Sequence, residues 1–342
     1  MKNWQWLRTD PELKKKLLLR EQVIDLLRQF FKTRQFHEVE TPLMWPVPSA
    51  EPYLEVFETE LLSPTRPPQK MYLLTSPEYA LKKLIAGGLG NIFQITKAFR
   101  NNEGISKKHN PEFTILEWYR VEADYAQLMT DCEQWLVELV KKIHGTNQLV
   151  YQGKKYDFTP PFICLSVTEA FWQTLGLSVD QVTSIDALKS KALELGYQVG
   201  EEANYEHVFN QLFLNRVEPM IAEQTKPVIL YDYPVELPSL ARKKASDPRF
   251  VERFELYVAG LELGNAFSEL TYLKEQKERL LADLALRRKL GKKAFPIDQE
   301  FIEALEAGLP PTAGMAIGVD RLVMLLADTA QISDTLFFPL AV

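Results

Sequence analysis

The stretch Phe99-Arg100-Asn101-Asn102-Glu103-Gly104-Ile105-Ser106-Lys107-Lys108-His109-Asn110-Pro111-Glu112-Phe113-Thr114-Ile115-Leu116-Glu117-Trp118-Tyr119 carries the clearest signal in the chain. It predicts a strand that ends in an arginine, a polar loop, and a second strand with an inward carboxylate. Enzymes that act on nucleoside triphosphates need a fixed guanidinium for the phosphate, a loop around the nucleotide and an aromatic face for the base. All three features occur here within a few residues, which indicates a nucleotide site.

Two predicted strands carry carboxylates toward the core. Residues two apart in a strand share a face. This rule groups Phe113, Ile115, Glu117 and Tyr119 on one strand, and Asn265, Phe267 and Glu269 on another. A buried carboxylate is too costly to remain unpaired, so these faces predict a pocket for a cation such as the side-chain amine of lysine. The alternative is that each carboxylate pairs with a lysine or arginine of the protein.

A hairpin is predicted from 252–259 to 261–270, with a tight turn at Ala259-Gly260. This register places Glu262 across from Tyr257 and diagonal to Glu255. Paired acids in this position suit a magnesium ion bound to nucleotide phosphates.

The spacing from Glu262 to Asn265 would send the two side chains to opposite faces of a regular strand. We therefore expect a β-bulge at Gly264, which would return both side chains to one face.

Three further segments have recognisable local patterns. Residues 17–31 have apolar positions at helical spacing, and a strand that ends at Thr41-Pro42 follows. After a strand at 71–74, Thr75-Ser76-Pro77-Glu78 predicts a helix start with a hydroxyl cap and proline in the first turn, and Gly87-Gly88 predicts its end. Capping alone accounts for Glu78. Near the chain end, 314–325 combines small residues with an arginine that begins a helix.

Composition excludes several classes of protein. With 342 residues, 46% hydrophobic and 25% charged, the chain is typical of globular proteins. It has neither a membrane-spanning apolar run nor a signal peptide, and its cysteines, Cys132 and Cys164, form no zinc motif. We therefore expect a cytoplasmic protein. The net charge of −6 disfavours binding to long nucleic acids, although basic clusters at 242–244 and 287–293 are candidates for contact with an acidic partner.

Taken together, these segments resemble the three motifs of class II aminoacyl-tRNA synthetases. The helix and strand up to Pro42 resemble motif 1, the stretch 99–119 resembles motif 2 with the lysine-specific wording His-Asn-Pro-Glu-Phe-Thr, and 314–325 resembles motif 3. The resemblance covers about residues 15 to 340. It implies an α+β fold, an antiparallel β-sheet flanked by helices, and a homodimer built on motif 1. We expect one catalytic domain, 1–342, with a mostly helical insertion at about 145–225.

The resemblance also assigns roles to residues. It implies Arg100 and Arg321 as the catalytic residues, with Arg100 on the α-phosphate and Phe113 stacked on adenine. The implied ATP-binding set is Arg100, Asn101, Asn102, Glu103, His109, Asn110, Phe113, Glu262, Leu263, Gly318 and Arg321, with Glu255 and Glu262 for Mg²⁺. The implied set for a lysine-like substrate is Ser76, Glu78, Glu117, Tyr119, Asn265, Phe267, Glu269 and Ala316. The motif 2 loop is one residue longer than usual, so either Asn102 or Glu103 takes the adenine-side role.

The family contains members with different acceptors. The motif 1 helix begins near the start of this chain, so we expect no anticodon-binding domain ahead of it. The chain thereby resembles truncated lysine-type enzymes, the ligases that attach (R)-β-lysine to a lysine of elongation factor P. The amino-acid sequence at 117–120 and 260–265, together with Ala316, agrees with that group. This resemblance implies ATP-dependent adenylation of lysine or (R)-β-lysine, and elongation factor P as the acceptor, with neither tRNA nor a membrane as partner.

Three alternatives remain open. The first is an enzyme that aminoacylates tRNA or another RNA. The second is a metabolic enzyme of the truncated asparagine-synthetase kind, which should have a basic side-chain pocket. The third is an inactive paralogue, which usually loses phosphate or metal ligands. The sequence leaves α-lysine and β-lysine undistinguished.

Overall fold

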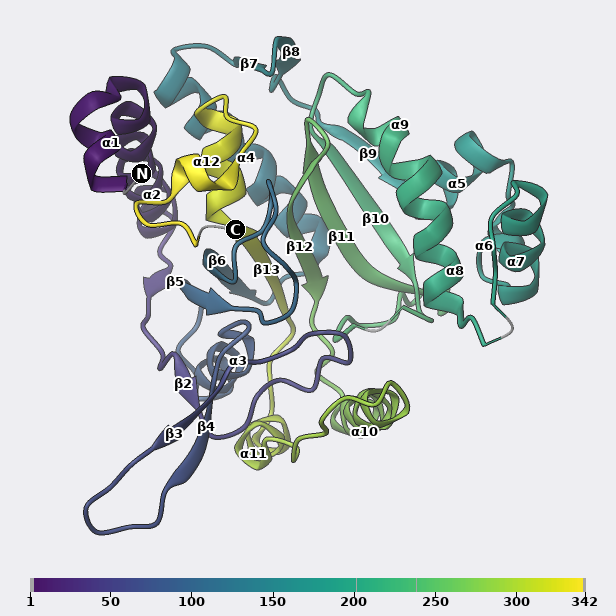
Figure 1. Cartoon of the computed structure of the whole chain (residues 1–342). Helices are drawn as coiled ribbons and strands as arrows, with labels where there is room; N and C mark the ends of the chain where they lie inside the picture. Colours follow the sequence, from purple (N-terminus) through teal and green to yellow (C-terminus); the bar gives the residue numbers. More distant parts are fainter. Residues whose placement is uncertain (1–2, 201, 238, 341–342) are drawn as a thin grey trace. The chain divides into compact units, whose positions relative to one another are not determined.

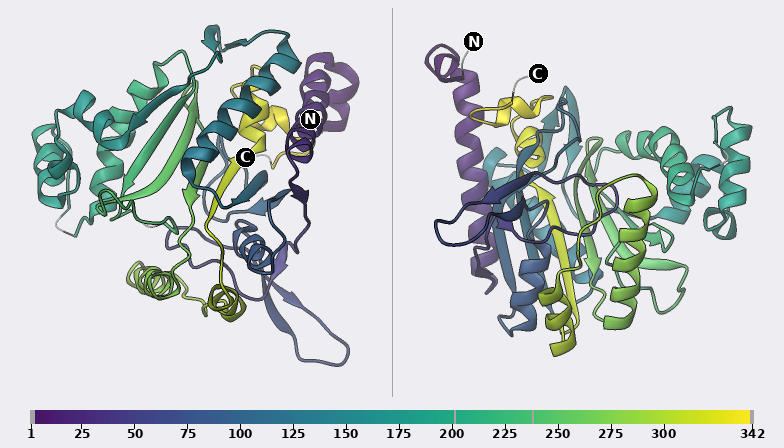
Figure 2. Two further views of the ribbon diagram at one scale, coloured as in Figure 1. Left: turned by 180° about the vertical axis from the view of Figure 1, so that it is seen from behind. Right: turned by 60° about the horizontal axis from the view of Figure 1, so that its bottom comes forward.

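A computed structural model describes residues 3–200, 202–237 and 239–340, and it divides into two units (Figures 1 and 2). The first unit joins Met1–Ala123 to Leu270–Val342, and the second is Asp124–Glu269. Within the described residues, none of the helices is long and apolar enough to cross a membrane. The expected division into one catalytic domain with an insertion stays a prediction.

The first unit has a sheet at its core. The strand order is β1 (His37–Glu38), β5 (Ile92–Phe99), β6 (Glu112–Val121) and β13 (Thr312–Gly318). The pairs β5–β6 and β6–β13 are antiparallel, and β1 runs parallel to β5. The predicted strand–loop–strand of motif 2 is therefore confirmed as β5 and β6. The middle residues of β6 are buried on both faces, and α3 and α12 both contact this strand.

Helices and a second small sheet complete this unit. The helical elements are α1 (Asn3–Thr9), α2 (Pro11–Thr33), α3 (Glu78–Ala86), α10 (Leu273–Lys289), α11 (Gln299–Ala307), α12 (Val319–Leu326) and the 3₁₀ helix η2 (Ile332–Thr335). The small sheet has the order β2 (Met44–Trp45), β4 (Gln69–Leu73), β3 (Glu58–Leu61). The helix predicted at 17–31 is confirmed as part of α2, which begins after Asp10, whose side chain accepts a hydrogen bond from the Leu13 amide at 2.9 Å.

The predicted start of α3 needs a correction. Pro77 occupies the N-cap position itself and does not lie in the first turn. A proline side chain offers no oxygen, so Ser76, one residue earlier, takes over and its Oγ accepts the Glu78 amide at 3.1 Å. The predicted end is confirmed, since Gly87 is the C-cap and Gly88 has a left-handed φ of 87°.

A buried ion pair connects the elements that correspond to the three motifs. Arg20 on α2 contacts Asp320 on α12 at 2.5 Å and donates to the Thr114 hydroxyl on β6 at 2.5 Å. The Thr114 amide in turn donates to the second oxygen of Asp320 at 2.8 Å. The Arg20 and Asp320 side chains are 10% and 2% exposed. One carboxylate therefore fixes α2 and β6 relative to the start of α12, and α2 and α12 lie side by side in Figures 1 and 2.

In the second unit the strand order is β12 (Leu261–Ser268), β11 (Phe250–Val258), β10 (Val228–Pro234) and β9 (Ile163–Ser166). The first two pairs are antiparallel and β9 is parallel to β10. The helical elements are α4 (Tyr125–His144), α5 (Val167–Leu175), α6 (Val179–Val182), α7 (Ile185–Glu194), α8 (Tyr205–Leu212), the π-helical turn η1 (Phe213–Val217) and α9 (Glu218–Ala222). Helix α4 packs on β11 and β12, and α5 packs on β9 and β10 (Figure 1).

The segment 145–225 contains the predicted helices and three strands that the sequence did not reveal. The helical elements in it are α5, α6, α7, α8, η1 and α9. The unpredicted strands are β9 and the hairpin β7 (Gln148–Tyr151) with β8 (Lys154–Asp157). Each has only four residues, which is too few for a clear period-two pattern.

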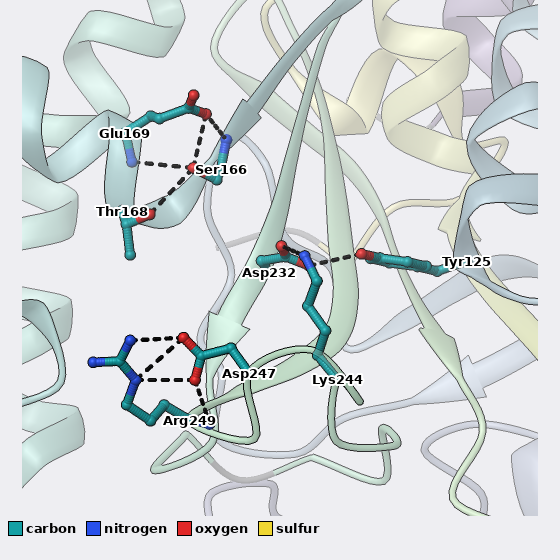
Figure 3. A network of polar contacts seen from close by, with 8 residues as sticks. All are labelled: Tyr125, Ser166, Thr168, Glu169, Asp232, Lys244, Asp247 and Arg249. Atoms are coloured by element: carbon teal, nitrogen blue, oxygen red, sulfur yellow. Dashed lines mark hydrogen bonds and ion pairs between the residues drawn. The ribbon is translucent and has the colours of Figure 1, made fainter. Parts of the chain in front are cut away.

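Strand β10 of this sheet has an irregularity. The register with β11 shifts between Tyr231 and Tyr233, and Asp232 has a left-handed φ of 60°. Its carboxylate accepts a hydrogen bond from the Tyr125 hydroxyl at 2.8 Å and pairs with Lys244 (Figure 3). These two contacts hold the bulged residue in a conformation that non-glycine residues rarely adopt.

The buried ion pair gives a stability prediction. We expect Asp320→Asn to lower the free energy of unfolding by about 3–5 kcal/mol, because Arg20 would remain buried without its counter-charge. Asp25→Asn is the matched control, since Asp25 is an exposed residue of α2 that lies 3.9 Å from Arg28. Urea unfolding followed by circular dichroism measures both variants. Equal losses in the two variants would show that the buried pair has no special weight.

Candidate functional site

In the first unit, the centre of the candidate site is the carboxylate of Glu117 on β6. The Ser76 hydroxyl donates to one of its oxygens at 2.5 Å, and the Tyr119 hydroxyl lies 3.2 Å from the other. Glu117 is 2% exposed, and Ala316 lies opposite it in the register with β13. Burial raises the pKa of Glu117 to about 8, although the Ser76 hydrogen bond opposes the shift. A buried carboxylate held by hydroxyl groups is suited to bind a cation.

The neighbouring Glu78 has a protein partner. Its carboxylate accepts a hydrogen bond from Lys82 Nζ at 2.5 Å, one helical turn further along α3, and Lys82 is buried. For Glu78, therefore, pairing with a protein lysine is the observed arrangement. The structure brings Ser76, Glu78, Glu117, Tyr119 and Ala316 together as predicted, and it adds Lys82, which the sequence did not single out.

The motif 2 arginine lies at the end of β5. The guanidinium of Arg100 is 5.3 Å from the centre of the Phe113 ring and 3.5 Å from Glu103. Asn101 forms an isolated bridge with Glu55, and Asn102 is exposed with a left-handed φ of 60°. The structure therefore brings the predicted phosphate and adenine residues Arg100 and Phe113 into contact. The choice between Asn102 and Glu103 for the adenine side stays open.

The motif 2 loop and the motif 3 arginine also meet. Arg321 lies 2.9 Å from Nε2 of His109, and the Ser106 hydroxyl lies 2.9 Å from Nδ1 of the same ring. Burial and the adjacent Arg321 lower the pKa of His109, so its ring stays neutral and Nε2 accepts a hydrogen bond from the guanidinium. Asn110 donates to the Glu112 carbonyl at 2.5 Å. Gly318 is the N-cap of α12, the helix that carries Arg321.

In the second unit, the predicted hairpin and its irregularity are confirmed. The turn residues Ala259 and Gly260 have φ values of 54° and 70°, as a type I′ turn requires. Leu256 pairs with Gly264 and Tyr257 with Glu262, so Leu263 is an extra residue. This bulge returns Glu262 to the face that it would otherwise leave. The registers then place Glu255, Glu262 and Asn265 on one face of the hairpin.

The carboxylate of Glu255 is held by three donors. It accepts hydrogen bonds from Tyr233 at 2.6 Å, from Tyr257 at 2.5 Å and from Arg253 at 2.6 Å. Arg253 also donates to the Asn265 side chain at 3.2 Å and lies 5.8 Å from the centre of the Phe267 ring. Burial and the charge of Glu255 raise the pKa of both tyrosines, which therefore stay protonated. Arg253 is a further site residue, recognisable in the sequence only by its position two residues before Glu255.

The hairpin face fits a magnesium ion that is bound partly by nucleotide phosphates. Mg²⁺ prefers one or two carboxylates plus phosphate and water oxygens over a cage of protein ligands. Glu255 and Glu262 supply two carboxylates on one face, and no group of three or more His, Cys, Asp or Glu side chains among the described residues is placed to hold a metal alone. Leu263 on β12 and Glu269, which directly follows this strand, are both buried, with 2% of each residue exposed.

Comparison with known proteins identifies the family. The family model for class II tRNA synthetases (D, K and N) matches residues 2–342. The chain belongs to this family. Two relatives are the lysine–tRNA ligases of Carboxydothermus hydrogenoformans, 37% identical over 334 residues, and Moorella thermoacetica, 37% identical over 333. The matches cover 97% and 96% of this chain but 66% of each relative, so the chain spans just under two thirds of their length. The predicted α+β class II fold is thereby confirmed.

The buried Glu117 gives a pH-dependent prediction. Because its pKa is raised to about 8, the folded protein holds a proton that the unfolded chain releases above its ordinary pKa of 4.5. Its contribution to stability therefore falls as the pH rises from about 5 to 8. Glu117→Gln removes this term, so we expect the stability of the variant relative to the unsubstituted protein to increase over that range. Thermal unfolding at several pH values measures it.

The control for this series is Glu60→Gln on the exposed strand β3. Its difference from the unsubstituted protein should stay flat with pH. A flat difference for Glu117→Gln as well would show that Glu117 ionises as an ordinary exposed carboxyl.

Proposed function

We propose that this protein activates lysine or (R)-β-lysine with ATP, forms an aminoacyl-adenylate, and transfers the acyl group to the ε-amine of a lysine in elongation factor P. The observation that carries the proposal is the buried, hydroxyl-held carboxylate of Glu117, which suits the side-chain ammonium of such a substrate. The relatedness to proteins named lysine–tRNA ligases supports the same substrate class.

In the first step, an oxygen of the substrate carboxylate attacks the α-phosphorus of ATP, and the bond to the bridging oxygen breaks to release pyrophosphate. The nucleophile is already ionised at neutral pH, so positioning and charge neutralisation are needed and a general base is not. We assign Arg100 to the α-phosphate and Arg321 to the opposite side of the nucleotide. The neutral His109 holds Arg321 in place without adding a positive charge.

We assign Glu255 and Glu262 to a magnesium ion, which would neutralise phosphate charge when it is bound with ATP. The part of this chain is to hold the two carboxylates in position. Tyr233, Tyr257 and Arg253 do so for Glu255, and the bulge at Leu263 does so for Glu262.

In the second step, the nitrogen of the acceptor amine attacks the carbonyl carbon of the mixed anhydride, and AMP leaves. A lysine acceptor with an ordinary pKa near about 10.4 must lose its proton first. None of the residues named above is assigned as the base that takes this proton.

The net charge of −6 disfavours a long RNA as the partner, and the state of the two basic clusters does not distinguish RNA from a protein acceptor. Arg242 pairs with Glu252 at 2.5 Å and Lys244 pairs with Asp232. Arg287 is 1% exposed, which removes it from any docking surface. Much of the positive charge in both clusters is therefore neutralised or buried, which weakens them as tracks for RNA phosphates. It weakens them equally as docking surfaces for an acidic protein.

Aminoacylation of RNA remains the second candidate, because the similar proteins named above are lysine–tRNA ligases. The test is ATP–pyrophosphate exchange with lysine, (R)-β-lysine, asparagine and aspartate, followed by transfer to purified elongation factor P or to bulk tRNA. We expect exchange with a lysine isomer and a matching mass increase on elongation factor P. Charging of tRNA instead would favour the second candidate, and exchange with none of the four would contradict adenylation.

The metal assignment predicts a specific defect. Glu262→Gln should raise the Mg²⁺ concentration for half-maximal pyrophosphate exchange at least about tenfold, because one carboxylate ligand is lost. Glu60→Gln should leave it unchanged. A Glu262→Gln variant with the ordinary Mg²⁺ dependence would remove Glu262 from the metal site.

A further inference from the structure

Glu51 is a carboxylate close to the candidate site that the sequence patterns did not single out. The Ser49 hydroxyl lies 3.1 Å from its Oε1 and 3.0 Å from the Thr75 hydroxyl. Thr75 precedes Ser76, whose hydroxyl holds Glu117. A short series of hydroxyl groups therefore connects the surroundings of Glu51 with those of Glu117, within the first unit.

A pocket opens at this series of hydroxyl groups. Its lining includes Ser49, Thr75, Ser76 and Tyr79, with Trp45 and Tyr72 on its apolar side. The Ala50 amide lies 3.5 Å from the Tyr79 hydroxyl, which places the chain segment around Glu51 at the wall of the pocket. The pocket combines apolar walls with a few hydroxyl groups, as small-molecule sites commonly do.

The segment that carries Glu51 has no secondary structure of its own, yet it is firmly held. Arg287, buried on α10, donates to the carbonyl oxygens of Glu51 and Leu54 at 2.6 Å each. Lys292 donates to the Tyr53 carbonyl at 2.5 Å. The Asn101 amide, next to Arg100, donates to the Glu55 carbonyl at 2.9 Å. These contacts fix Glu51 relative to the end of β5.

Glu51 lies on the Arg100 side of the site, because the Asn101 amide holds the Glu55 carbonyl of the same segment. Burial raises the pKa of Glu51, nearby Arg100 opposes the shift, and Glu78 and Glu103 add to it. The charges that act on Glu117 are those of Glu78 and Lys82. The charge of Glu78 thus affects both Glu51 and Glu117, whereas the charge of Arg100 affects Glu51.

The carboxylates of this part of the first unit are held in two different ways. Glu78 pairs with Lys82 and Glu103 with Arg100. The side-chain hydrogen bonds of Glu51 and Glu117 come instead from hydroxyl groups. A substrate with two ammonium groups would supply one cation to each of these two carboxylates, and lysine and β-lysine are diamino acids of this kind.

We propose that Glu51 binds the ammonium group nearer to the substrate carboxyl, while Glu117 binds the distal one. This inference rests on the proposed function, because Arg100 is assigned to the phosphate at which the substrate carboxyl reacts. The substrate end close to Arg100 is then the carboxyl end. Glu51 would therefore determine which amino acids are accepted by the position of their proximal amine.

Substrates that lack one amine test this division of roles. Isothermal titration calorimetry with the full chain compares lysine, 6-aminohexanoate, which lacks the proximal amine, and norleucine, which lacks the distal one. We expect Glu51→Gln to weaken lysine and norleucine by about 30-fold or more and to leave 6-aminohexanoate within about threefold. Glu117→Gln should show the reverse pattern. Glu60→Gln is the control and should change none of the three.

Equal weakening of all three ligands by Glu51→Gln, or no weakening, would overturn the role of Glu51 while leaving the proposed function intact. Pyrophosphate exchange with aspartate or asparagine and none with lysine isomers would instead refute the proposed function and this inference with it. Glu51→Asp, which keeps the charge, should recover part of the norleucine affinity, and its failure to do so would contradict a charge-based role.

Discussion

The ion pair between Arg20 and Asp320 is the constraint on which the first unit depends. It lies within hydrogen-bonding distance of Thr114, so one carboxylate and one guanidinium orient the elements of all three motifs. Asp320 precedes Arg321, and Thr114 follows Phe113. Two residues assigned to the nucleotide are therefore the direct sequence neighbours of the residues in this buried contact, and their positions follow from it.

The chemistry of the site follows from an excess of carboxylates in a buried place. Glu78 is balanced by Lys82 and Glu103 by Arg100, while hydroxyl groups hold Glu117 and Glu51. Hydroxyl groups orient a carboxylate without placing an opposite charge beside it. Glu117 therefore keeps its proton up to a pH of about 8 in the absence of a cation and can ionise against a cationic ligand, at some cost in stability. In the second unit, Glu255 also accepts hydrogen bonds from hydroxyl groups, those of Tyr233 and Tyr257, but Arg253 adds a positive charge beside it.

The sequence predicted those features that depend on short-range spacing. The face of Glu117 and the bulge beside Gly264 follow from the two-residue period of strands, and the tight turn at Ala259-Gly260 was predicted with the hairpin; the structure contains each of them. The family was predicted from the motifs, and the family model confirms it. The four-residue strands β7, β8 and β9 were not predicted, because so short a pattern is indistinguishable from a loop.

The position of Glu51 was not predictable because it depends on contacts between distant parts of the chain. Its segment shows neither helical nor strand periodicity, and its carbonyl is held by Arg287, 236 residues away. Arg287 itself belongs to a run of basic residues that composition assigns to the surface, whereas the side chain is buried. Lys82 was missed because its burial is not visible in the sequence: a lysine one turn after Glu78 is also typical of an exposed helix.

A crystal structure with a non-hydrolysable lysyl-adenylate analogue would show whether Glu117 binds the substrate ammonium. We expect the side-chain ammonium of the analogue to lie within hydrogen-bonding distance of a Glu117 carboxylate oxygen. An analogue whose ammonium lies away from Glu117, with that carboxylate still held only by Ser76 and Tyr119, would contradict it.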